Sequence, residues 1–273
     1  MHTGDAAINS ARRPLTGPDE VTFTLLGPVE VLRDGADHAP TTPKVRQLLA
    51  LLLTRPGEVI HIDSIIQELW ANRPPRSVRT TVHTYVHHLR RIMEQLGYAP
   101  DAVLVTRTPG YQLRIAPAQV DVSAFHRECQ QGRDLLRRQE FLEAAARFRA
   151  AQAVWSGPPL ANVHCGPLLT AYGVQLLEQR RHAQDLRIEA EISGGAHREL
   201  IGELRALAAA NPLDEGVHGQ LMRVLGRSGR RSDAMASYRQ LRARLNEELG
   251  VEPCGELQLL HRQLLSDGHL KAS

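Results

Sequence analysis

The stretch SVRTTVHTYVHHLRRIM, residues 77–93, carries side chains that can hydrogen-bond to phosphates and base edges. At about 3.6 residues per turn, its apolar residues share one stripe of a predicted helix, namely Val78, Val82, Val86, Leu89 and Met93. The opposite face carries Arg79, Thr80, His83, Thr84, His87, His88, Arg90 and Arg91. Arginine donates paired hydrogen bonds to phosphate or guanine, and threonine and histidine bind other base edges. Solvated faces usually mix charges, whereas this one has only Glu94 nearby, so we favour nucleic-acid binding over a merely solvated face.

Each polar residue of this face has an expected role. Nearest the floor of a major groove we expect the hydroxyl and imidazole side chains of Thr80, Thr81, His83, Thr84, His87 and His88. Closer to the phosphates we expect Arg79, Arg90 and Arg91. His83 and His87, four residues apart, also suit a metal ion, but Thr84 stands where a zinc-protease motif has glutamate, and no third ligand has suitable spacing. We therefore predict neither a metal nor a cofactor.

Positive charge is concentrated around this helix. The whole chain has a formal charge of +3 and a pI of about 9.0. Between residues 76 and 114, six arginines are opposed by Glu94 and Asp101, which gives a local balance of +4. From residue 116 onward, 20 basic and 19 acidic residues nearly cancel. This distribution predicts that a polyanion is attracted to the first part of the chain.

Length and composition indicate a cytoplasmic, non-enzymatic protein of two domains or one large one. The 273 residues suffice for two cores, and 42% hydrophobic with 23% charged residues are typical of globular proteins. No apolar run approaches the ~20 residues that a membrane span needs, and the N-terminus lacks the apolar centre of a signal peptide. Cys129, Cys165 and Cys254 form no CxxC pair. The chain has neither a GxSxG nucleophile motif nor a phosphate-binding loop, so we predict no enzyme activity.

The residues before the basic helix are expected to complete a winged helix-turn-helix domain over 21–115. A disordered tail is predicted over 1–20, and alternating apolar residues then predict strands near 21–26, 28–33 and 36–40. Pro43 opens a first helix. The second helix, HIDSIIQELW, has Asp63 as its expected N-cap and Trp70 as a core anchor. The basic helix is the third and is expected to span about 76–96.

A β-hairpin is predicted after the third helix. Two alternating apolar runs, with Val103 and Val105 in one and Tyr111, Leu113 and Ile115 in the other, flank the turn Arg107-Thr108-Pro109-Gly110. The tip therefore presents Thr106, Arg107 and Thr108, and arginine suits phosphates or a narrow minor groove. In winged helix-turn-helix domains the third helix enters the major groove, and the hairpin reaches the flanking backbone or minor groove.

A wholly helical pattern follows a predicted linker at 116–120. Over 121–266, small and apolar residues fall at tetratricopeptide offsets: Gly132, Leu135, Ala144, Phe148 and Ala151 in one helix pair, with Leu200 and Ala234 34 residues apart in later ones. A generic helical bundle is the alternative. The predicted fold class is mainly α with a small β component: a winged helix-turn-helix domain followed by an all-α tetratricopeptide-like helical-repeat domain, with a tail at 267–273.

Longer strings carry a family resemblance. SVRTTVHTYVHHLRR and VLVTRTPGYQL resemble the third helix and wing of OmpR/PhoB-type domains, although His88 stands where arginine is often found, which weakens the case for direct guanine readout there. DVSAFHRECQQGRDLL, LEQRRHAQDLRIEAEI and NPLDEGVHGQLMRVLGRSG resemble the bacterial transcriptional activation domain. From about Val21 to Leu265 the chain resembles the small Streptomyces antibiotic regulatory proteins of actinobacteria. No phosphoacceptor receiver domain is recognised, so aspartyl phosphorylation is not the expected switch.

The resemblance implies a sequence-specific, DNA-binding transcriptional activator that is cytoplasmic and nucleoid-associated. Two copies would bind side by side on direct repeats overlapping the promoter −35 region. They would recruit RNA polymerase holoenzyme through sigma region 4, the β flap or the α C-terminal domain, for genes of an antibiotic or other secondary-metabolite cluster. The alternatives are a repressor of the same fold and a tetratricopeptide-type protein-interaction scaffold.

Overall fold

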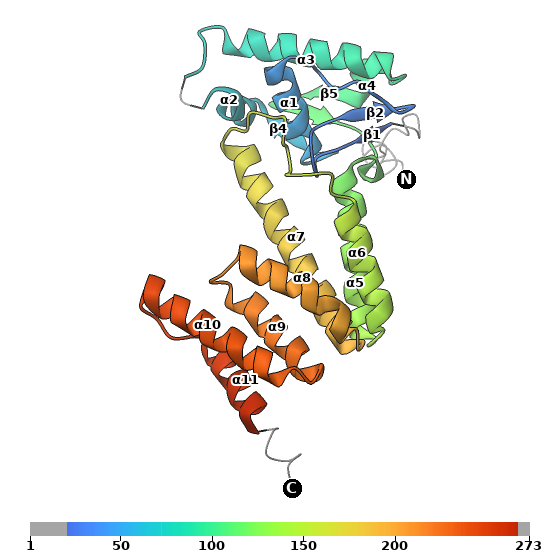
Figure 1. The fold of residues 1–273 in the computed structure, drawn as a ribbon. Helices are drawn as coiled ribbons and strands as arrows, with labels where there is room; N and C mark the ends of the chain where they lie inside the picture. Colours follow the sequence, from blue (N-terminus) through green and yellow to red (C-terminus); the bar gives the residue numbers. More distant parts are fainter. Residues whose placement is uncertain (1–20, 72, 267–273) are drawn as a thin grey trace, which may run out of the picture. The chain divides into compact units, whose positions relative to one another are not determined.

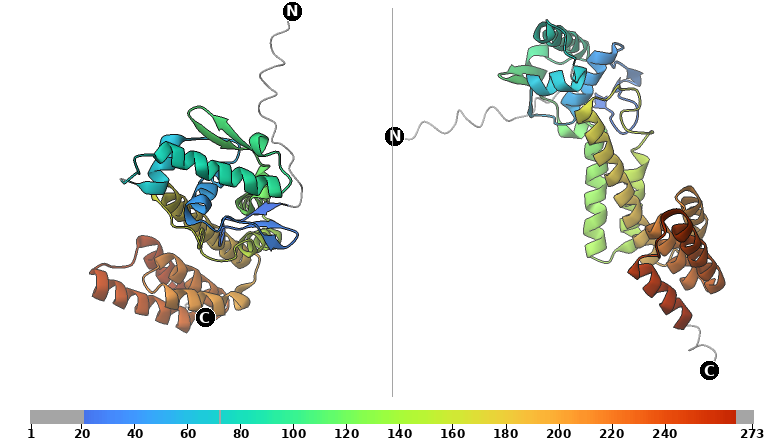
Figure 2. Two further views of the ribbon diagram at one scale, coloured as in Figure 1. Left: turned by 90° about the horizontal axis from the view of Figure 1, so that it is seen from above. Right: turned by 90° about the vertical axis from the view of Figure 1, so that its left-hand side faces the viewer.

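The computed structural model describes residues 21–71 and 73–266 (Figures 1 and 2). The tails predicted at 1–20 and 267–273 lie outside the described residues. The chain divides into two compact units. Unit 1 contains the chain up to Gln130 together with Arg149–Ala183, and unit 2 contains Gln131–Phe148 and the chain from Gln184 onward. Each unit is described by itself below.

Unit 1 begins with a small antiparallel sheet of order β1-β2-β3. Its strands are β1 (Thr22–Phe23), β2 (Val31–Arg33) and β3 (Ala36–Asp37). The predicted strands at 21–26, 28–33 and 36–40 were too long. After β1, the Leu25 and Leu26 amides donate to the Asp121 carboxylate, at 2.9 Å each, instead of pairing with a strand. The strand pairing therefore stops before the Gly27-Pro28 break.

Three helices pack beside this sheet: α1 (Pro43–Leu53), α2 (Ile62–Trp70) and α3 (Val78–Gln95). Helix α1 begins with proline and buries every residue from Gln47 to Leu53, so it forms the centre of the domain. The prediction of Asp63 as N-cap was wrong, because His61 holds that position and Asp63 lies in the first turn of α2. Trp70 anchors α2 against α3 by stacking on Tyr85, with 6.1 Å between ring centroids.

The predicted hairpin is confirmed and belongs to a second antiparallel sheet of order β4-β6-β5. After the short helix α4 (Pro100–Val103), β5 (Leu104–Arg107) pairs with β6 (Gly110–Leu113), and β6 also pairs with β4 (Val59–His61). Strand β4 was not expected from the sequence. Its backbone passes so near Gly110 that a Cβ there would lie 1.9 Å from the Ile60 carbonyl oxygen. Glycine is therefore needed where the wing meets the domain.

The rest of the described chain is helical, with one 3-10 turn, η2 (Pro117–Gln119), before it. The helices are α5 (Asp121–Arg137), α6 (Phe141–Ala153), α7 (Pro167–Ser193), α8 (His197–Ala210), α9 (Glu215–Arg227), α10 (Arg231–Leu249) and α11 (Gly255–Ser266). The mainly α fold class is as predicted. In unit 2, α9 packs between α8 and α10 around Leu204, Met222 and Leu241. None of the described helices is long and apolar enough to cross a membrane.

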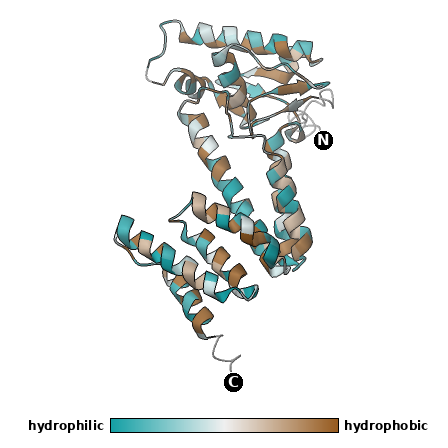
Figure 3. Cartoon of the chain, viewed as in Figure 1, coloured by the Kyte–Doolittle hydropathy of each residue, from teal (hydrophilic) through white to brown (hydrophobic). Residues whose placement is uncertain are grey.

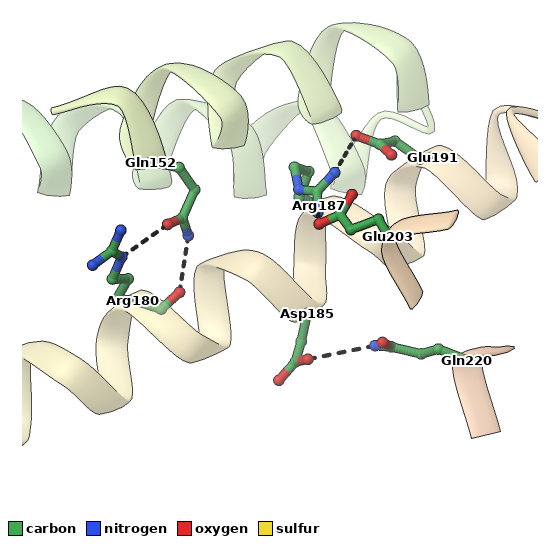
Figure 4. A network of polar contacts seen from close by, with 7 residues as sticks. All are labelled: Gln152, Arg180, Asp185, Arg187, Glu191, Glu203 and Gln220. Carbon is green, nitrogen blue, oxygen red and sulfur yellow. Dashed lines mark hydrogen bonds and ion pairs between the residues drawn. The ribbon is translucent and has the colours of Figure 1, made fainter. Parts of the chain in front are cut away.

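Helix α7 makes polar side-chain contacts at several positions along its length (Figure 4). Within unit 1, the Arg180 Nε donates to Gln152 of α6 at 3.2 Å, and the Arg180 guanidinium lies 4.6 Å from the Trp155 ring centre. Within unit 2, the buried Arg187 bonds Glu191 at 3.0 Å and also pairs with Glu203 of α8. Because both ions of a buried pair have lost water, loss of either partner costs more than loss of an exposed pair.

The winged helix is joined to the first part of the helical region within unit 1. Asp121, the first residue of α5, accepts the Leu25 and Leu26 amides. The Asn162 side-chain oxygen accepts the Val29 amide at 2.7 Å, and its amide group donates to the Val29 carbonyl at 3.2 Å. Two side chains thus satisfy the backbone that follows β1, where the sheet leaves it unpaired.

A third contact between the winged helix and the helical region is made by the buried Glu68 of α2, and of the three it contains the most backbone amides. Glu68 is 1% exposed, and its carboxylate accepts the backbone amides of Gly166, Leu168 and Leu169 at 2.6, 2.8 and 3.1 Å. These amides lie at the N-terminus of α7, just before the helix at Gly166 and in its first turn at Leu168 and Leu169, where the helix dipole also favours a negative charge. Gln47 of α1 donates to the same carboxylate at 3.0 Å. Glu68 therefore caps a helix that begins at Pro167, 99 residues later in the sequence.

We expect Glu68→Gln to lower the free energy of unfolding of unit 1 by about 1–3 kcal/mol, because an amide cannot accept all of these hydrogen bonds and leaves buried donors unpaired. Both tryptophans, Trp70 and Trp155, lie in unit 1, so urea unfolding followed by tryptophan fluorescence measures this unit. The matched control is Glu94→Gln, at an exposed position of α3. Equal unfolding free energies for the two variants would contradict the capping role.

Candidate nucleic-acid interface

Helix α3 lies on the outside of unit 1, and no other described element covers its outer face (Figures 1 and 2). The predicted apolar stripe faces inward: Val82, Val86, Leu89 and Met93 are each at most 1% exposed. Hydrophobic and hydrophilic segments consequently alternate along the helix (Figure 3). This burial fixes which side chains remain outside.

The residues predicted for the groove floor lie on or beside the outer face. Thr80, His83, Thr84, His87 and His88 are exposed, and Thr81 is half-buried. The Thr81 hydroxyl donates to the Ser77 carbonyl at 3.2 Å, and the Thr84 hydroxyl donates to the Thr80 carbonyl at 3.1 Å. Since their hydrogens are used within the helix, these threonines offer oxygen lone pairs and methyl groups to a ligand.

His83 is held in place by Tyr111 of the hairpin. The phenol oxygen lies 2.6 Å from His83 Nδ1, and the two rings meet edge to face with 6.1 Å between centroids. Burial raises the pKa of the Tyr111 phenol, although the nearby Arg90 charge lowers it, so the phenol stays protonated at neutral pH. With Tyr111 donating to Nδ1, a neutral His83 carries its proton on Nε2 and presents a hydrogen-bond donor.

Two of the three predicted phosphate-contacting arginines of α3 are available to a ligand. Arg91 is exposed and forms no ion pair with the described residues. The Arg79 side chain is 66% exposed and lies 3.5 Å from Asp63. An exposed pair of this kind contributes little free energy, so a phosphate can replace Asp63 as the partner of Arg79.

Arg90 lies in a different environment from the other two arginines. Its side chain is 23% exposed, and Asp101 is 3.2 Å away. Its Nε and Nη2 donate to the Leu104 carbonyl at 3.0 and 2.8 Å, and Nη2 also donates to the Thr106 hydroxyl at 3.0 Å. Arg90 therefore connects α3 to the base of the wing. Both Arg90 and Thr106 were predicted as DNA contacts, and the structure pairs the half-buried Arg90 with the exposed Thr106 at the base of the wing.

The tip of the wing carries Arg107 and Thr108, which are both exposed. The Ile62 amide donates to the Pro109 carbonyl at 3.0 Å, and the Gly57 amide donates to the Leu113 carbonyl at 2.7 Å, so the hairpin is tied at both ends. The outer face of α3 and the wing tip therefore belong to one rigid domain. Arg73 and Arg76, in the exposed connection between α2 and α3, add cations that the site prediction did not include.

The arrangement suits a nucleic acid better than a metal. In the described part of the chain, no three His, Cys, Asp or Glu residues are grouped closely enough to hold a metal ion. The exposed residues of α3 and the wing instead combine arginines with neutral donors and acceptors. This is the combination that binds phosphates and base edges of duplex DNA.

Comparison with known protein families matches both halves of the chain. Residues 37–113 match the model of the C-terminal domain of transcriptional regulatory proteins. Residues 120–265 match the bacterial transcriptional activator domain. The first match contains α3 and the wing, and the second contains α5 to α11.

Two regulatory proteins align with most of this chain. The chain is 37% identical to the regulatory protein DnrI of Streptomyces peucetius over 89% of this chain and 91% of that protein. It is 34% identical to the regulatory protein AfsR of Streptomyces coelicolor over 96% of this chain and 26% of AfsR.

A solved structure is similar over most of the fold. Mycobacterium tuberculosis EmbR, in complex with a low-affinity phosphopeptide, gives a TM-score of 0.86 at 32% identity over 91% of this chain and 65% of that one. The two domain matches, the relatives and the similar solved structure all indicate the same family. The chain belongs to the Streptomyces antibiotic regulatory protein family of DNA-binding transcriptional regulators.

Proposed function

We propose that the protein is a sequence-specific transcriptional activator that reads promoter DNA with the outer face of α3. The observation that carries the proposal is that this face offers exposed arginine, histidine and threonine side chains beside the exposed arginine of the wing. Helix α3 enters the major groove, where His83, His87 and His88 meet base edges. Arg79, Arg91 and Arg107 bind phosphates on either side.

The wing and α3 act as one unit in this proposal. Arg90 bonds the Leu104 carbonyl and the Thr106 hydroxyl, and Tyr111 bonds His83. These contacts are made before DNA arrives, so little conformational entropy is lost when the domain docks. Arg90 then acts by positioning the wing, while Arg91 and Arg107 supply the charge.

The helical domain serves as the protein-binding half of the molecule. We assign DNA binding to 21–115 and activation to 121–266, joined at 116–120. Two copies bind side by side on direct repeats overlapping the −35 region, and the activation domain contacts RNA polymerase at sigma region 4, the β flap or the α C-terminal domain. A contact of ~1.4 kcal/mol raises promoter occupancy about tenfold when polymerase binding is limiting. Similarity to the Streptomyces regulators DnrI and AfsR supports targets in a secondary-metabolite gene cluster.

We expect Arg91→Ala and Arg107→Ala each to weaken binding to all DNA sequences and to flatten its salt dependence. The slope of log K against log salt changes by about 0.9 for each phosphate that the protein no longer neutralises. Fluorescence anisotropy of a labelled promoter fragment at several salt concentrations measures both effects. The matched control is Arg127→Ala, which removes an exposed arginine of α5 from the same unit.

Arg90 provides a contrast in the same measurement. Because its guanidinium is engaged by the Leu104 carbonyl and the Thr106 hydroxyl, Arg90→Gln should lower the affinity for the promoter while leaving the salt slope closer to that of the native protein. Salt slopes that match Arg127→Ala in both Arg91→Ala and Arg107→Ala would contradict the docking of α3 and the wing on phosphates.

A repressor of the same fold differs from an activator in the sign of its effect on transcription. We expect purified protein to increase transcript from its target promoter in a reconstituted reaction with RNA polymerase holoenzyme. The increase should be absent from a promoter whose repeats are scrambled. A decrease in transcript from the intact promoter would establish the repressor instead.

A further inference from the structure

Helices α8, α9 and α10 of unit 2 line a cavity of about 390 Å³ that is partly open to solvent. Its inner surface is formed by the apolar side chains of Ala208, Leu221 and Leu225, which are at most 7% exposed. Its rim is polar and includes Arg205, Gln240 and Arg244. Pockets of roughly 300–1,000 Å³ with apolar walls and a few polar groups are typical of small-molecule sites.

A buried histidine with an unused ring nitrogen lines this cavity. His218 is 5% exposed, and its Nδ1 lies 3.2 Å from the Ser237 hydroxyl. Its Nε2 has no hydrogen-bond partner among the described residues. Burial lowers the pKa of His218, helped by the Arg244 charge and opposed by the Pro212 carbonyl and Asp214. The ring is therefore neutral near pH 7 and adds an uncharged polar side chain to the lining of the cavity.

The rim of the cavity has an excess of positive charge. Arg205 lies 3.1 Å from Asp233, which also accepts a hydrogen bond from the Arg230 Nε at 2.9 Å. Arg244 is half-buried and forms no ion pair with the described residues. A partly desolvated guanidinium without a carboxylate partner is stabilised by an anion, which it binds through two parallel hydrogen bonds.

We propose that this cavity binds a small amphipathic carboxylate. The carboxylate pairs with Arg244, and the apolar part of the ligand covers Ala208, Leu221 and Leu225. Neither the family matches nor DNA binding requires this site, so the proposal stands independently of the proposed function. The volume fits a free acid of one or two rings, or a medium aliphatic chain, rather than a folded peptide.

Isothermal titration calorimetry of the full chain with 2-naphthoate and decanoate tests the site. We expect saturable binding of at least one of these acids and binding at least about tenfold weaker for its uncharged alcohol, 2-naphthylmethanol or decanol. Arg244→Gln should weaken binding of the acid about tenfold. The matched control, Arg239→Gln, neutralises an exposed arginine of α10 that does not line the cavity and should leave the affinity unchanged.

Ala236→Trp provides a second, independent variant. Ala236 is an exposed residue at the rim, so a tryptophan there obstructs the cavity without disturbing the core, and circular dichroism verifies the fold. Loss of acid binding in this variant supports the site. Three results overturn the proposal: no saturable binding of either acid at millimolar concentration, equal affinities for acid and alcohol, or equal affinities in Arg244→Gln and Arg239→Gln. Tighter binding of a peptide with a free C-terminal carboxylate, acetyl-Ala-Ala-Phe, than of both acids would overturn the small-molecule assignment.

Discussion

The buried carboxylate of Glu68 is the interaction on which unit 1 most depends. It is 1% exposed and accepts three backbone amides at the start of α7, so a helix from the second family domain begins on a side chain of the DNA-binding domain. Burying a charge costs free energy unless hydrogen bonds replace the lost water. Here Gln47 and the α7 amides provide that replacement. Because α2, which carries Glu68, also packs against α3, α2 contacts both the start of α7 and helix α3.

A second set of contacts fixes the orientation of the outer face of α3. The apolar side of α3 is buried down to at most 1% at Val82, Val86 and Leu89, which fixes the rotation of the helix. Arg90 and Tyr111 then join its outer half to the wing. The residues that remain exposed on α3 are mostly arginine, histidine and threonine. A rigid frame with an exposed polar face is what specific base contacts require.

The local parts of this structure could be predicted from the sequence, whereas the long-range contacts could not. Periodicity located α3, and the Thr108-Pro109-Gly110 turn located the hairpin. Each of these signals is contained in a short run of neighbouring residues. Strand β4 has only three residues and is recognisable only by its pairing with β6, about fifty residues later. Glu68 was not singled out from the sequence, and Arg90 was predicted as a phosphate contact rather than as a link to the wing. Their roles depend on partners up to 101 and 16 residues away, which no local pattern reveals.

The central claim is that the exposed face of α3 reads a particular DNA sequence. Its most direct test is recovery of fragmented genomic DNA on the purified full chain at physiological salt, followed by sequencing. We expect sharp enrichment of tandem repeats at a fixed spacing, upstream of biosynthetic genes. Flat recovery that does not depend on sequence would contradict the claim, since the arginines would then provide only the non-specific attraction that any basic surface has for DNA.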